Sequence, residues 1–231
     1  SFQLDGRGEP RPIGIGLATQ VTPVFGVRQK VRVGLAAALL EFADYTECEY
    51  VALTVDGQLA VATDDYARLD ARDRAVLDAL LAVATPATCR DMPLFLPDFS
   101  PDVPYRLLTF RLTHAVEVVM LCGPDQDVEE IQMGKIKPIF GRPDVLELIR
   151  ECDSCARGGR NVPRDVVVDA GITAFVAVHR TARQVLTYVS DGAEARKRLV
   201  DGVDEAMAAI RDALEHSRRA MLAVPEGTDA H

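Results

Sequence analysis

Two short β-prone runs on either side of a single Asp-Gly pair constrain the fold more than any other feature of this sequence. The runs are Tyr50–Val55 (YVALTV) and Gln58–Thr63 (QLAVAT). An Asp-Gly pair in this setting favours the two-residue turn of an antiparallel hairpin. Two further runs, Tyr105–Leu112 and Val116–Cys122, predict a second hairpin that ends at Gly123-Pro124. We therefore expect an antiparallel sheet.

Helical patterns alternate with these hairpins. In Gln29–Phe42 the apolar residues recur at spacings of four, four and three, which predicts a helix with one apolar face. Asp70–Ala84 carries a broader apolar stripe, and Pro86 ends that helix. Asp127–Cys152 predicts two helices with a turn near Phe140–Pro143. This order predicts an α/β (α+β) fold in which helices flank one antiparallel sheet.

A proline-rich segment, Pro93–Pro104, precedes the second hairpin and contains four prolines. Proline fixes φ and has no amide hydrogen to donate, so such a segment favours an extended conformation. The sequence therefore predicts a rigid connector, and the wider stretch from Cys89 to Pro124 shows no obvious catalytic group.

The composition divides the chain into four segments. Residues 1–20 are rich in Gly, Pro and charge and predict a tail or linker, whereas residues 21–152 hold the sheet and helices described above. Residues 153–165 contain a Gly-Gly pair and alternating charges, as is typical of an exposed linker. Within residues 166–231, Ile172–Val178 and Val185–Val189 predict a hairpin, and a long amphipathic helix is expected from about Ala193 to Met221. Because a lone hairpin with one helix is marginally stable, this segment predicts part of a domain.

Composition excludes several classes of protein. With 231 residues, 48% of them hydrophobic, the chain can bury a substantial core. It has no run of about 18 apolar residues for a membrane helix, and a net charge of −9 argues against a nucleic-acid partner.

Five unevenly spaced cysteines fit a reducing, cytosolic compartment. The first residues show no secretory signal, and we expect the chain to be a fragment.

The C-x-x-C formed by Cys152 and Cys155 is the first candidate for site chemistry. A structural zinc site needs four ligands, and a redox pair needs to start a helix after a strand. The sequence has no second C-x-x-C, and this pair falls at the end of a predicted helix. Chance spacing in a linker is the favoured interpretation.

Other candidates are isolated. His114, His179 and His216 share no motif, so turn and surface positions are favoured over a catalytic triad. Gly14-Ile15-Gly16 lacks the strand and helix of a nucleotide-binding loop. Asp64-Asp65 favours a helix entry or loop over a metal site. We therefore assign no catalytic, cofactor-binding or metal-binding residue.

The basic end of the last predicted helix is a further isolated feature, formed by Arg211 and Arg218-Arg219. Cations near a helix C-terminus interact favourably with the helix dipole. We favour this interpretation, and a contact with a partner or a membrane surface is the alternative.

Several short pieces of the chain are unusual: Arg90-Asp91 with Pro93, Leu96-Pro97, Ser100-Pro101, Val103-Pro104, Arg106-Leu107-Leu108-Thr109 and Leu121-Cys122-Gly123-Pro124. Together these pieces resemble the second longin domain of the Fuzzy family of planar cell polarity effectors. The resemblance covers about 100 residues and implies that residues 21–152 are a second longin-like domain. From Pro163 onward the chain is similar, more loosely, to the start of a third longin domain, which makes residues 166–231 a partial one.

The resemblance implies a noncatalytic scaffold without a cofactor. Fuzzy-family proteins pair with an Inturned-type longin protein and join a Wdpcp-type subunit in the CPLANE assembly, which engages a Rab-like small GTPase and supports ciliogenesis. The expected place is the cytoplasm at the cilium base, with peripheral membrane association through the complex. Guanine nucleotide exchange is expected only of the heterodimer. The alternative is a small-molecule-binding or enzymatic α/β domain, which predicts a deep polar pocket where His114 or His179 meets carboxylates.

Overall fold

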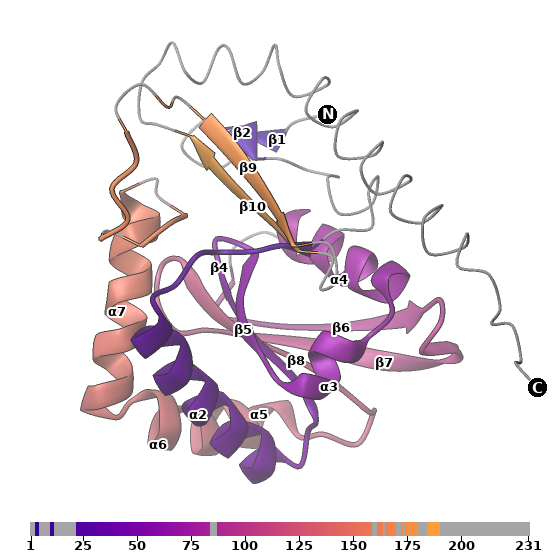
Figure 1. The fold of residues 1–231 in the computed structure, drawn as a ribbon. Helices are drawn as coiled ribbons and strands as arrows, with labels where there is room; N and C mark the ends of the chain where they lie inside the picture. Colours follow the sequence, from indigo (N-terminus) through magenta and orange to yellow (C-terminus); the bar gives the residue numbers. More distant parts are fainter. Residues whose placement is uncertain are drawn as a thin grey trace, which may run out of the picture.

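The centre of the molecule is a five-stranded antiparallel sheet with the strand order β5-β4-β8-β7-β6. The computed structural model describes residues 3–4, 10–11, 22–83, 87–158, 161–163, 165–169, 172, 174–179 and 184–189. The strands of the sheet are β4 (Tyr50–Val55), β5 (Gln58–Ala62), β6 (Cys89–Leu96), β7 (Ser100–Arg111) and β8 (Val116–Cys122). Helices cover both of its faces (Figure 1). The predicted class, an antiparallel sheet flanked by helices, is confirmed.

The Asp-Gly turn joins β4 to β5 as predicted. Asp56 has a φ of 49° and Gly57 a φ of 74°, so both residues lie in the left-handed region. Asp and Gly enter this region more readily than other residues, which makes the pair suited to a tight hairpin turn.

One face of the sheet is covered by α2 (Gln29–Thr46), α5 (Val128–Glu130), the π-helical turn η1 (Ile131–Lys135), α6 (Ile136–Phe140) and α7 (Pro143–Arg157). The aromatic rings of Phe42 and Phe140 meet here with centroids 5.2 Å apart. The predicted helix from Gln29 and the predicted break after Phe140 are both confirmed, although α2 continues to Thr46.

The opposite face is covered by α3 (Asp64–Arg68) and α4 (Ala71–Val83). Side chains alternate along β8, so Val118 and Met120 join the first core while Val119 and Leu121 join this one. The strand is therefore apolar on both faces, as a central strand between two helical layers must be.

The prediction that Pro93–Pro104 is a connector is wrong. This segment forms the second half of β6, the turn and the first five residues of β7, and the two strands pair with each other as a long ribbon. The prolines are tolerated because β6 is the edge strand and because β7 pairs with β8 only from Arg106 onward. The predicted strand at Tyr105 consequently begins at Ser100.

Helix α7 extends into the predicted linker of residues 153–165. It ends at Arg157, and Asp153 and Cys155 are buried in it. Residues 153–157 therefore belong to the helical layer, because apolar contacts continue past Cys152. The division of the chain into domains otherwise stays a prediction.

A second, three-stranded sheet has the order β3-β10-β9, from β3 (Thr22–Pro23), β9 (Ala174–His179) and β10 (Gln184–Val189). The predicted hairpin of β9 and β10 is confirmed, and β3 adds to it in parallel. The segment after β3 joins the two sheets, since the amide of Val24 donates to the carbonyl of Val185 and that of Phe25 donates to the carbonyl of Leu59.

The remaining described pieces are β1 (Gln3–Leu4) and β2 (Pro10–Arg11), an antiparallel pair inside the predicted tail. The long helix predicted from Ala193 to Met221 lies outside the described residues, as do Gly14 to Gly16, His216, and the arginines at 211, 218 and 219. Within the described part of the chain, no helix has both the length and the apolar character needed to cross a membrane.

Candidate functional site

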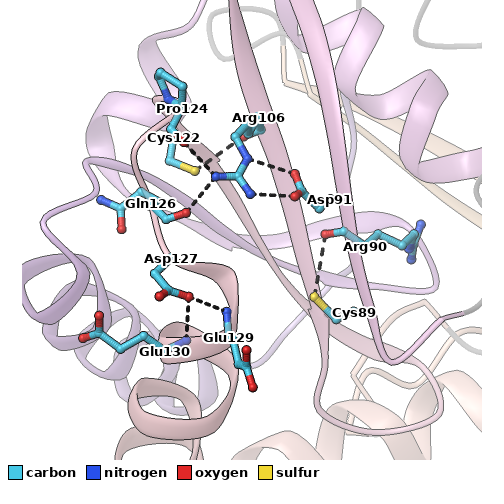
Figure 2. A network of polar contacts seen from close by, with 10 residues as sticks. All are labelled: Cys89, Arg90, Asp91, Arg106, Cys122, Pro124, Gln126, Asp127, Glu129 and Glu130. Atoms are coloured by element: carbon cyan, nitrogen blue, oxygen red, sulfur yellow. Dashed lines mark hydrogen bonds and ion pairs between the residues drawn. The ribbon is translucent and has the colours of Figure 1, made fainter.

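Arg106 is the centre of a polar network on the face of the sheet that α2, α5, α6 and α7 cover (Figure 2). Its Nε and Nη2 donate to Asp91 Oδ1 at 3.1 Å and to Oδ2 at 2.6 Å, a bidentate pair between β7 and β6. Its Nη1 donates to the carbonyl oxygens of Pro124 at 2.9 Å and Gln126 at 2.7 Å. One guanidinium thus fixes two strands and the loop that follows β8. We call these residues the Arg106 clamp.

The loop held by the Arg106 clamp leads directly into α5. Asp127 caps that helix, because its Oδ1 accepts from the amides of Glu129 at 2.9 Å and Glu130 at 3.1 Å. The carbonyl contacts and the cap together set the direction in which the chain leaves β8 toward α5, η1, α6 and α7.

The electrostatics of the Arg106 clamp favour positioning over chemistry. The hydrogen bond that Arg106 donates to the Asp91 carboxylate raises the pKa of Arg106, so the guanidinium stays charged. The thiol of Cys122 donates to the carbonyl oxygen of Arg106 at 3.7 Å, and burial raises its pKa to about 11. Burial also raises the pKa of Cys89. Since a thiolate is the reactive form of cysteine, the raised pKa values disfavour a nucleophilic role for both thiols.

Asp73 forms a second clamp on the opposite face of the sheet. Its side chain is fully buried, and its two carboxylate oxygens accept from the amides of Asp98 and Phe99 at 2.9 Å each. The ring of Phe99 then meets Tyr50 and Tyr105 with centroids 4.9 and 5.1 Å apart. Helix α4 thereby holds the β6–β7 turn against the sheet.

Asp153 forms a third clamp, from α7 to the β7–β8 turn. Its Oδ1 accepts from Thr113 Oγ1 at 2.7 Å and from the Ala115 amide at 3.1 Å, and Arg157 pairs with Oδ2 at 2.5 Å. Burial alone would raise the pKa of this carboxyl, but the three donors outweigh burial and lower it. The turn that carries His114 is therefore fixed by a residue of the predicted linker.

An open depression of about 270 Å³ lies between α3, the start of α4 and the β6–β7 turn. It is lined in part by Tyr50, Phe99, Asp65, Asp70 and Asp98. Asp98 is paired with Arg72 at 3.0 Å, and Asp65 is paired with Arg68 at 3.3 Å. Neither His114 nor His179 lines it, so it is not the histidine-containing pocket that an enzymatic domain predicts.

The two cysteines of the C-x-x-C lie in α7 as free thiols, and both are buried. Burial raises the pKa of Cys152 to about 12. The expectation that the pair has no special chemistry stays a prediction, but its placement in a linker is wrong because apolar contacts hold it in the helix.

The other sequence candidates fall at separate places. His114 lies in the β7–β8 turn and His179 ends β9, and both are exposed. Asp64 and Asp65 open α3 behind its cap Thr63, which confirms the predicted helix entry. Among the residues that the structure describes, no group of His, Cys, Asp and Glu could hold a metal ion.

Sequence reasoning missed Arg106, Asp73 and Asp153 as organising residues. Asp153 had been placed in a linker, and Asp73 was only one residue of the helix predicted over Asp70–Ala84. Arg106 could have been found, because an arginine in an otherwise apolar strand run is a signal of a buried or partly buried partner.

Comparison with known proteins bears on the same residues. Residues 46–137 match the family model described as the second longin domain of FUZ, MON1 and HPS1. A curated relative from Xenopus tropicalis, named protein fuzzy homolog, is 32% identical over 152 residues, which is 66% of this chain and 35% of the relative. The relatives of that name from Rattus norvegicus and Homo sapiens are 32% identical over 145 residues and 30% identical over 152 residues.

These matches support the interpretation that this chain is a Fuzzy-type protein. The predicted resemblance is thereby confirmed, and the chain spans about a third of the length of the curated relatives that it matches. Asp91, Arg106 and Pro124 belong to three different pieces that carried the resemblance. These pieces are separated in the sequence, and the three residues meet in the Arg106 clamp. The Fuzzy-type pattern in this chain therefore marks how the longin sheet is joined to its helices.

Proposed function

We propose that this chain is a noncatalytic scaffold of a CPLANE-type complex. In this proposal the chain pairs with an Inturned-type longin protein and joins a Wdpcp-type subunit, and the complex engages a Rab-like small GTPase. The complex lies in the cytoplasm at the cilium base. Nucleotide exchange, planar cell polarity and ciliogenesis then belong to the complex, as does any peripheral contact with a membrane. The observation that carries the proposal is the longin match over residues 46–137.

Three charged residues in and around the sheet support a scaffold role. The side chains of Asp73 on α4, Arg106 on β7 and Asp153 on α7 each hydrogen-bond to the backbone of a turn or loop and hold it in place. The thiols of Cys48, Cys122 and Cys152 have raised pKa values because they are buried. Groups with these environments rigidify a surface and do not activate a substrate.

The three-stranded sheet supports pairing with another protein. β9 is its edge strand, and Val176 and Val178 on β9 are 38% and 37% exposed. An edge strand with exposed apolar side chains favours pairing with a further strand or helix. We therefore assign β9 to the interface with the Inturned-type partner.

Binding of the purified chain to an Inturned-type longin protein, measured by calorimetry, tests this assignment. Replacing Val176 and Val178 together by lysine is expected to weaken binding about tenfold or more, because two apolar contacts are lost and two charges are buried. The matched control is Val33→Lys on α2, a valine that is 58% exposed and lies outside β9. No binding by the unaltered chain, or equal loss in the control, would end the proposal.

A further inference from the structure

A row of polar side chains crosses the α3–α4 face of the sheet at the end nearest the Asp-Gly turn. Glu117 on β8 pairs with Arg90 on β6 at 2.5 Å and with Arg111 on β7 at 3.1 Å. Thr54 on β4 lies opposite Glu117 in the strand register. We call these four residues the arginine row.

The arginine row is separate from the Arg106 clamp. Successive side chains of a strand point to opposite faces, and Figure 2 shows Arg90 and Asp91 leaving β6 in opposite directions. Asp91 is engaged by Arg106 on the other face. Its carboxylate therefore does not balance the charge of the arginine row.

The arginine row contains more positive than negative charge. Two guanidiniums share the single carboxylate of Glu117, which leaves a net charge of +1. The side chains of Arg90, Glu117 and Arg111 are 11%, 13% and 27% exposed. A charge in such a setting is costly unless an opposite charge pairs with it.

Several polar atoms of the arginine row have no hydrogen-bond partner. Within the described part of the chain these are Nε and Nη1 of Arg90, Nε of Arg111 and Oγ1 of Thr54, all buried. Buried donors are nearly always satisfied in proteins, and an unsatisfied group calls for an explanation such as a bound ion. Three N–H donors and a hydroxyl beside an excess positive charge suit one compact group with several acceptor oxygens.

We propose that Arg90 and Arg111, together with the Thr54 hydroxyl, bind a phosphate group. Arginine is suited to phosphate because its donors form a planar fork that matches two of the phosphate oxygens. We place the entry of the ligand at Arg111, because its side chain, 27% exposed, is the most accessible of the three charged ones. Arg90 lies too deep for a membrane surface to reach, so the phosphate belongs to a small solute or to a single phosphorylated side chain.

The test is an NMR titration of the full 231-residue chain with inorganic phosphate, observed at the arginine Nε–H signals. The signals of Arg90 and Arg111 are expected to shift in a saturable manner, because their Nε–H groups are the unpaired donors. Potassium chloride at matched ionic strength should leave them in place. No saturable shift with phosphate, or the same shift with chloride, overturns the proposal.

A parallel titration with O-phosphoserine identifies the source of the phosphate group. Binding as tight as that of inorganic phosphate indicates a phosphorylated side chain, and weaker binding indicates a free solute.

Two variants move the affinity in opposite directions. Arg111→Gln is expected to weaken phosphate binding about tenfold or more, because it removes one charged donor group. Glu117→Gln should tighten it, because the net charge of the row rises while the shape is kept. Arg28→Gln is the matched control, since Arg28 also pairs with a glutamate but at the surface between α2 and α7. Unchanged affinity in both row variants would overturn the proposal, and NMR affinities remain readable if either variant is less stable.

Discussion

The two sheets of this molecule differ in how they are stabilised. The five-stranded sheet has an apolar core on each face, with Leu53, Leu107, Met120 and Leu121 fully buried. In the three-stranded sheet only Thr22 and Val185 are buried among the strand residues whose burial the structure describes. Since burial of apolar surface is the main stabilising contribution, the two sheets are expected to open with different free energies.

The comparison separates a sheet that has its own apolar core from a sheet that lacks one. The larger sheet is fixed to its turns and helices by the Arg106 clamp, Asp73 and Asp153. The smaller sheet reaches the larger one through the segment after β3 and leaves β9 exposed. In our proposal, an Inturned-type partner supplies the burial that the smaller sheet lacks.

Matched core truncations give the largest expected difference between the sheets. Phe42→Ala removes a fully buried ring that packs on Phe140, and it should lower the free energy of unfolding by about 3–5 kcal/mol. Val178→Ala on β9 should lower it by less than about 0.5 kcal/mol, because that side chain is 37% exposed. Urea denaturation followed by circular dichroism measures both, and similar losses would break the comparison.

Removing a polar clamp should have the next largest effect. Asp73→Ala leaves the amides of Asp98 and Phe99 without an acceptor and is expected to cost about 2–3 kcal/mol. Asp102→Ala is the control, an exposed aspartate on the same ribbon. A loss near zero for Asp73→Ala would mean that the β6–β7 turn is held by its aromatic contacts alone.

The junction between the sheets should depend on pH through Asp78 on α4. Burial raises its pKa to about 7, while a hydrogen bond with Thr22 of β3 and the charge of Arg74 act in the opposite direction. Between about pH 4, where an unfolded aspartate ionises, and pH 7 the folded chain holds the extra proton. Stability should therefore fall as the pH rises through this window, by about 1–3 kcal/mol.

Asp78→Asn tests that dependence. The variant should show unfolding midpoints in urea that vary less between pH 4 and 7, and it should be more stable than the parent at pH 8. A parent protein whose stability is constant over this window would contradict the assignment of a buried proton to the junction.

An exposed ion pair should give the smallest effect. Glu151→Gln breaks the contact of α7 with Arg28 at the start of α2, and it should change stability by less than about 0.5 kcal/mol. Thermal unfolding at low and high salt measures this change. A cost comparable with that of Asp73→Ala would show that the helical layer depends on surface charge more than on its apolar core.

The sequence predicted the parts of the fold that have a local cause. The Asp-Gly turn, the helix from Gln29 and the strand Val116–Cys122 each follow from spacing or turn chemistry within a few residues. β6 was missed because a proline argues against a strand unless the strand lies at the edge of a sheet. The edge position of β6 depends on the pairing of distant segments, which the local sequence does not reveal. The Arg106 clamp was missed for the same reason, since Asp91 and Gln126 meet Arg106 only after the sheet has formed.

Hydrogen exchange followed by mass spectrometry, with and without an Inturned-type longin protein, tests the central claim most directly. The account predicts slow exchange in β4, β7 and β8 under both conditions. It predicts fast exchange in β9 and β10 of the chain alone and slower exchange there once the partner binds. Equal protection of the two sheets in the chain alone, or no change in β9 when the partner is bound, would contradict it.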